Sequence, residues 1–118
     1  MFSKKSKDDR ETEIEGYFGS SSSFSGKLFF ESPVRIDGKV EGEVEGSTLI
    51  FGESADIKAI VKGGTVIVGG KLTGDMDCGE KLVIKSTGSV TGNIKTNKLI
   101  IEDGGIFNGS CKMELVKN

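Results

Sequence analysis

The chain of 118 residues contains no histidine, no tryptophan, one proline and two cysteines. The absence of histidine excludes a histidine general base, a Ser-His or Cys-His nucleophile and every metal site that needs an imidazole ligand. Cys78 and Cys111 do not form a CxxC pair, so the chain has no cysteine zinc motif. We expect both to be reduced thiols at core or surface positions, as in an intracellular protein.

Long apolar segments are also missing. The longest apolar runs are three residues, at 49–51 and 99–101 for example, so no membrane-spanning segment is predicted. We find no signal peptide. The net charge of −2 gives no general electrostatic reason to bind nucleic acid. Only 35% of the residues are hydrophobic, a content that alone would be compatible with disorder.

The chain has instead 18 glycines, arranged in a repeat. Five segments open with an apolar residue, at positions 34, 49, 66, 82 and 99, which are 15, 17, 16 and 17 residues apart. Apolar residues alternate within a segment, as Val34 and Ile36 do, which is strand periodicity with one buried face. A period near 16–17 residues is too short for a helical-hairpin solenoid and suits one coil of a β-solenoid.

The repeat predicts an all-β fold, a single three-sided parallel β-helix with short disordered termini. Seventeen residues of about 3.3 Å each give a perimeter of roughly 56 Å, or about 18 Å for each of three sides, and side chains can fill such an interior. Some six coils, stacked at about 4.8 Å, make a rod about 29 Å long. The expected domains are a leader over 1–16, the β-helix over 17–116 and a tail over 117–118. The segment 53–63 lacks its central glycine, for which Ala59 is the candidate substitute.

The stretch 33–44 reads PVRIDGKVEGEV, and with the coils that follow to about residue 116 it resembles the bactofilin family. The leader MFSKKSK resembles leaders of that family. The resemblance implies a right-handed β-helix that polymerises into non-polar filaments without bound nucleotide or metal. It also implies attachment to the inner face of the cytoplasmic membrane through the leader, and roles in cell shape, appendage placement, motility or recruitment of cell-wall enzymes.

The two ends of a solenoid expose unpaired backbone groups and a slice of the core. This chain offers no amphipathic helix as a cap, so we predict that copies stack end to end. Five of the seven phenylalanines lie in the terminal zones, and aromatic residues are preferred interface anchors. The predicted contacts at the C-terminal end are Ile106, Phe107, Met113, Leu115 and Val116. Those at the N-terminal end are Tyr17, Phe18, Phe24, Leu28, Phe29 and Phe30.

Phe107 has two interpretations. The family resemblance implies a subunit contact for an aromatic residue in the last coil. The alternative is that Phe107 covers the core of its own monomer.

The leader is the predicted membrane-binding segment. One apolar ring contributes roughly 1.5–3 kcal/mol and each lysine near an anionic surface about 1 kcal/mol. The residues concerned are Met1, Phe2, Lys4, Lys5 and Lys7. The alternative is a solvated charged tail, because five acidic residues follow between positions 8 and 15.

Two further segments carry local predictions. Asp37, Glu41, Glu43 and Glu45 are expected to face solvent with Lys39, because the calcium-binding GGxGxDx pattern is absent. The serine run 20–23 is either a flexible linker or an exposed corner before the first coil, and we favour the corner.

The predicted function is that of a structural cytoskeletal protein, not an enzyme, with no cofactor, nucleic acid or small-molecule substrate. The expected partners are copies of itself, the inner face of the cytoplasmic membrane and cell-wall or morphogenesis proteins. The expected location is cytoplasmic and peripheral on the inner membrane. The alternative is a monomeric β-helical accessory domain for a cell-envelope enzyme, which would stay monomeric at high concentration.

Overall fold

The computed structural model describes residues 16–31 and 33–113, with side chains from residue 19 onward. This part of the chain contains strands and turns but no helix. Every strand pairing in it is parallel. The strands are β1 (Gly16–Phe18), β2 (Ser23–Phe30), β3 (Val34–Ile36), β4 (Lys39–Phe51), β5 (Asp56–Val68), β6 (Lys71–Thr73), β7 (Met76–Ile84), β8 (Ser89–Thr96), β9 (Leu99–Ile101) and β10 (Ile106–Met113).

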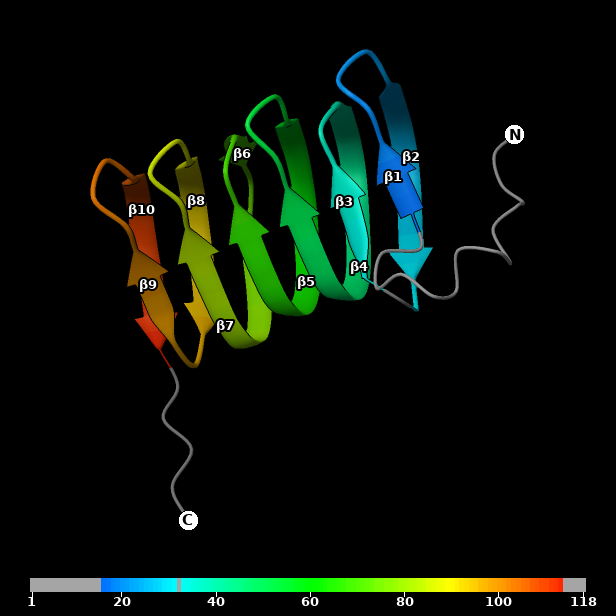
Figure 1. Cartoon of the computed structure of the whole chain (residues 1–118). Coiled ribbons are helices and arrows are strands. Elements are labelled where there is room, and N and C mark those ends of the chain that lie inside the picture. Colours follow the sequence, from blue (N-terminus) through cyan, green and yellow to red (C-terminus); the bar gives the residue numbers. More distant parts are fainter. Residues whose placement is uncertain (1–15, 32, 114–118) are drawn as a thin grey trace.

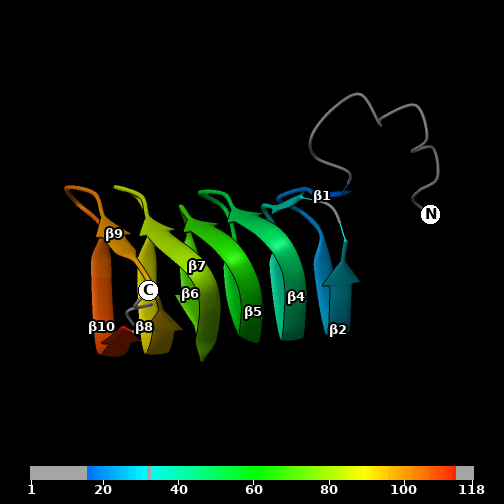
Figure 2. The same cartoon turned by 90° about the horizontal axis from the view of Figure 1, so that it is seen from below.

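The strands wind into a single β-solenoid, with β1 and β2 at one end and β9 and β10 at the other (Figure 1). Seen from below, the coils stand side by side in a row that runs from β2 to β10 (Figure 2). One side of the solenoid, face one, stacks the segments 16–18, 34–36, 49–51, 66–68, 82–84 and 99–101 in register. The chain makes one turn of the solenoid between each of these six segments and the next, which gives about five turns. The predicted opening positions of the repeat are all confirmed as stacked partners.

The core consists of columns of inward-facing side chains. One column holds Phe24, Val40, Ile57, Leu72, Val90 and Phe107. A second holds Leu28, Val44, Val61, Met76, Ile94 and Cys111. All inner members of both columns are at most 3% exposed. Only every second residue of each strand enters this core, so a low hydrophobic content suffices.

Glycine is required at one corner of every coil but one. The corner column holds Gly26, Gly42, Ala59, Gly74, Gly92 and Gly109. Its glycines have φ between 126° and 141°, a region that favours glycine. A Cβ on Gly42 would also lie 1.9 Å from the carbonyl oxygen of Gly26. Ala59 occupies the same corner without a positive φ, so the predicted substitution is confirmed.

The prediction that Asp37 faces solvent was wrong. Asp37 is only 8% exposed, and the Arg35 Nε–H donates a hydrogen bond of 3.0 Å to its Oδ2. Its Oδ1 leans over Gly52, where a Cβ would lie 1.7 Å away. Glycine in the next coil thus makes room for the carboxylate. The three glutamates and Lys39 are exposed as predicted.

Two corners differ from the regular repeat. Ser20 and Ser21 form an exposed turn, which the Ser22 N–H closes by donating to the Gly19 carbonyl at 2.9 Å, so the favoured prediction of a corner holds. The register between β5 and β7 shifts after Gly63, so that residues 79 and 80 lie opposite the single residue 64. This β-bulge adds one residue to the corner between Cys78 and Lys81 relative to the preceding coil.

Candidate self-assembly site at the two ends

The N-terminal end consists of the first coil, where β2 pairs with β4 on one side and with no described strand on the other. Phe24, Leu28 and Phe30 are half-buried and pack against the core. Phe29, by contrast, is 65% exposed. Tyr17 and Phe18 lie in β1, next to β3. Of the four predicted contacts whose side chains are described, three extend the core and one is an exposed ring.

The C-terminal end has the same design. β10 pairs with β8, and no described strand lies on its other side. Phe107 is half-buried and packs against the core, whereas Ile106 is 51% and Met113 48% exposed. Leu115 and Val116 lie outside the described residues.

One of the core columns has a phenylalanine at each end. Phe24 begins this column and Phe107 ends it; both are half-buried, and no strand of the described residues stacks on their outer sides. Their four inner partners are fully buried. The ends therefore present a cross-section of the core next to strand edges whose outward N–H and C=O groups have no strand partner in the described chain.

Cys111 belongs to this exposed cross-section and was not among the predicted contacts. It ends the second core column, where Ile94 is its partner in the neighbouring coil. The signal for it was available in the sequence, because it lies 17 residues after Ile94 and therefore one coil further along.

The other cysteine, Cys78, lies inside the core. Burial raises the pKa of the Cys78 thiol from 9.0 to about 12, and the neighbouring Asp77 carboxylate adds to the shift. This thiol is 1% exposed. Cys78 is therefore a neutral core residue at physiological pH, as predicted.

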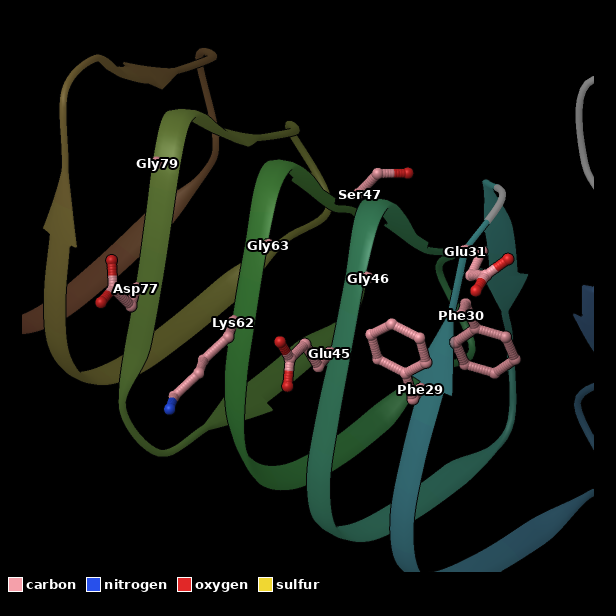
Figure 3. A pocket seen from close by; sticks show the side chains of 10 residues that line it. All are labelled: Phe29, Phe30, Glu31, Glu45, Gly46, Ser47, Lys62, Gly63, Asp77 and Gly79. Carbon is pink, nitrogen blue, oxygen red and sulfur yellow. The ribbon is translucent and has the colours of Figure 1, made fainter.

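A shallow groove of about 510 Å³ follows one corner of the solenoid near the N-terminal end (Figure 3). Glu45, Lys62 and Asp77 project from successive strands in register, so their charges alternate along the groove. Phe29 lies at its N-terminal side. Opposite charges are therefore neighbours along this groove.

Two kinds of site are not found in residues 16–31 and 33–113. No group of three or more Cys, Asp or Glu residues there is arranged to hold a metal ion. No helix of sufficient length and hydrophobicity to cross a membrane occurs in the same residues. The predicted membrane-binding residues Met1, Phe2, Lys4, Lys5 and Lys7 lie outside them.

The comparison with known proteins agrees with this architecture. The family model described as "Bactofilin: Polymer-forming cytoskeletal" matches residues 16–112. The chain is similar to Bactofilin BacP of Myxococcus xanthus (strain DK1622), with 34% identity over 96 residues, 80% of this chain and 40% of BacP. It is also similar to Bactofilin BacO of the same strain, with 28% identity over 98 residues, 82% of this chain and 78% of BacO.

The chain thus spans less than half the length of BacP but most of BacO. No solved structure gives a significant match. The family match covers nearly the whole described solenoid. The chain therefore belongs to the bactofilin family of polymer-forming cytoskeletal proteins.

Proposed function

We propose that this chain assembles end to end, without a nucleotide, into filaments that serve as a structural scaffold rather than an enzyme. One observation carries the proposal: both ends of the solenoid present a slice of core beside a strand edge that no described strand covers. Stacking the last coil on another end would cover the half-buried Phe107 and pair the outward backbone groups. Fully burying one such ring is worth roughly 1.5–3 kcal/mol.

The test compares Phe107→Arg with Asn108→Arg. Both replace a residue of β10 with arginine, but Phe107 faces the core and Asn108 is exposed. Purified protein without nucleotide is sedimented and viewed by negative-stain electron microscopy. We expect wild type and Asn108→Arg to form filaments and Phe107→Arg to stay soluble with an intact β-type circular dichroism spectrum.

Two other results would contradict the assignment of this contact. Filaments of all three proteins would place the contact away from Phe107. A wild type that remains monomeric at high concentration would favour the alternative function, a monomeric accessory domain.

The proposal includes binding to the inner face of the cytoplasmic membrane through the leader. Phe2 and three lysines together contribute at most about 5–6 kcal/mol, which is weak for one molecule. A filament that displays many leaders raises their effective concentration and so strengthens attachment. Clients that belong to cell-wall or morphogenesis machinery are part of the same proposal, and the family resemblance supports them.

Co-sedimentation with anionic vesicles tests the leader. We expect wild-type filaments to bind and Phe2→Ser filaments to bind less. Soluble Phe107→Arg is expected to bind weakly because it lacks avidity. Equal binding of all three proteins would exclude the leader as the anchor.

A further inference from the structure

The groove near the N-terminal end, which we call the corner groove, has a floor without side chains. Gly46 and Gly63 stack in register and contribute only backbone to this floor. Glu45, Lys62 and Asp77 stand along one side of it, one on each of three successive rungs (Figure 3). The corner groove is therefore a channel along the solenoid axis with charged side chains on its wall.

Charge and one exposed ring determine what can occupy the corner groove. Glu31, Glu45 and Asp77 line it with three carboxylates, against the single ammonium of Lys62. None of these four charged groups has an ion-pair partner within the part of the chain that the structure describes. Phe29 begins the same outward column as Glu45 and is 65% exposed. The corner groove thus suits an occupant that carries several cations and an apolar side chain.

The size of the corner groove favours a short extended segment over a folded partner. It crosses four rungs spaced about 4.8 Å apart, so it is only about 14 Å long. Stable complexes of folded proteins usually bury about 800 Å² on each partner. A channel of this length offers much less area, whereas it holds about four residues of an extended chain.

The first residues of the chain, 1–15, join the solenoid beside the corner groove. β1 begins at Gly16, which stands two rungs before Leu49 in the same stacked column. Residues 45–47, which line the groove, come shortly before Leu49 in the chain. Because the stacked strands run parallel, β1 starts at the corner that the groove follows, at the N-terminal end of the groove.

The leader has the composition that suits the corner groove. Its first half carries Lys4, Lys5 and Lys7, with Phe2 as its only aromatic residue. Its second half, from position 8 to position 15, holds five carboxylates, which like charges keep from the acidic groove. The eight residues of this second half span up to about 26 Å, so the lysines can reach any of the four rungs.

The covalent link makes a weak contact sufficient. Exposed ion pairs contribute only about 0–1 kcal/mol each, so a free segment would bind the groove weakly. A short flexible linker holds a segment at a millimolar effective concentration. A contact with a Kd of about 1 mM is then occupied about half of the time. This favours the leader of the same subunit over a segment of another molecule at micromolar concentration.

We propose that the corner groove is a docking site for the leader of the same subunit, with the three lysines against the groove carboxylates and Phe2 against Phe29. The same leader residues form the proposed membrane anchor, so a docked leader is withheld from the membrane. Anionic lipid has to compete with the groove for the lysines. Only this competition rests on the proposed membrane binding, whereas the docking does not.

The test compares Glu45→Lys with Glu41→Lys. Both residues lie in β4, both are exposed and both substitutions add the same charge, but only Glu45 lines the groove. A carbodiimide couples neighbouring lysines and carboxylates in full-length protein, in which heavy-isotope-labelled and unlabelled copies are mixed before assembly. Mass spectrometry measures cross-links from the leader lysines to Asp77, relative to the link between Lys85 and Glu102, an ion pair of 3.4 Å. Circular dichroism checks the fold.

We expect cross-links between the leader and Asp77 in wild type and Glu41→Lys, within single isotope labels, and at least about fivefold fewer in Glu45→Lys. Equal cross-linking in all three proteins, or none in wild type, would overturn the docking. Cross-links that join the two labels would assign the groove to the leader of another copy, and would overturn docking within one subunit. If Glu45→Lys does not fold, Asp77→Lys repeats the test with cross-links to Glu45 as the readout.

Vesicle binding separates the docking from its proposed consequence. In the soluble Phe107→Arg background we expect Glu45→Lys to bind anionic vesicles several-fold more tightly than Glu41→Lys, because its leader is no longer held. Equal vesicle binding by two variants that differ in cross-linking would support the docking and refute the competition with the membrane. Tighter vesicle binding by Glu45→Lys without any difference in cross-linking would overturn the docking.

Discussion

At the scale of single residues, the corner column shows where glycine is required. Gly92 combines a φ of 141° with a hypothetical Cβ that would lie 1.9 Å from the Gly74 carbonyl oxygen. Gly79 also lies at a corner, but the nearest atom to its hypothetical Cβ is 4.0 Å away and its φ is not positive. These two glycines form a matched pair for mutation.

We predict that Gly92→Ala lowers the free energy of unfolding by about 2–4 kcal/mol, because alanine strains this backbone and meets a backbone oxygen. Gly79→Ala should change it by less than about 0.5 kcal/mol. Urea denaturation of both variants in the Phe107→Arg background, where polymers do not interfere, measures the difference. Similar losses from the two substitutions would contradict this explanation of the corner glycines.

The buried Cys78 thiol makes the free energy of unfolding depend on pH. Its folded pKa of about 12 lies above 9.0, so its contribution to stability is complete below pH 9 and is lost as the pH rises toward 12. We predict that the free energy of unfolding falls by up to about 1.4 kcal/mol per pH unit in this range because of Cys78. Denaturation at pH 8 to 11 should show a shallower decline for Cys78→Ala than for the control Cys111→Ala. Parallel declines would exclude Cys78 as the source.

At the scale of strands, the sequence pattern predicted much of the architecture. Alternating apolar residues and a period near 16–17 located the stacked strands, because each inward position recurs once per coil. The burial of Asp37 could not be predicted, since it depends on the space above Gly52 in the next coil. The bulge after Cys78 depends equally on register between coils.

The outward aliphatic residues Ile50, Ile67, Val83 and Ile100 of face one were visible in the sequence but were interpreted only as short apolar runs. Three consecutive apolar residues, as at 49–51, place the middle side chain outside a strand whose neighbours point inward. Of the assembly site, the aromatic residues Phe24 and Phe107 were predicted because they flank the repeat. Cys111 was missed because its role depends on its place at the end of a column.

The proposed end-to-end stacking predicts a change in the hydrogen-exchange protection of specific strands. In the soluble Phe107→Arg variant the amides of β2 and β10 that point away from their single partner strands should exchange with solvent rapidly. In wild-type filaments we predict that both strands become protected, while β4 and β5, which are paired on both sides, change little. Hydrogen–deuterium exchange with mass spectrometry reads this out by peptide. Unchanged exchange in β2 and β10 on assembly would mean that these edges are not the contacts.

At the scale of the whole molecule, the number of stacked rungs determines the axial rise per subunit in the proposed filament. Six rungs at about 4.8 Å give an axial rise of about 29 Å per subunit if the sheets continue across the contact. We predict this rise in cryo-electron microscopy of wild-type filaments, with a true repeat of about 58 Å if like ends meet. A markedly larger rise would show that the terminal rungs do not touch and that other segments bridge the subunits.

The bulge at Gly79 and Glu80 has a practical consequence for imaging. In the proposed end-to-end filament, a fluorescent protein fused next to the first or last described strand would lie beside a stacking end, whereas the corner at these two residues lies in the middle of the rod. The bulge shows that this corner holds one residue more than the corner stacked below it. A small tag placed between Gly79 and Glu80 is therefore the labelling position that the architecture favours for following these filaments in living cells.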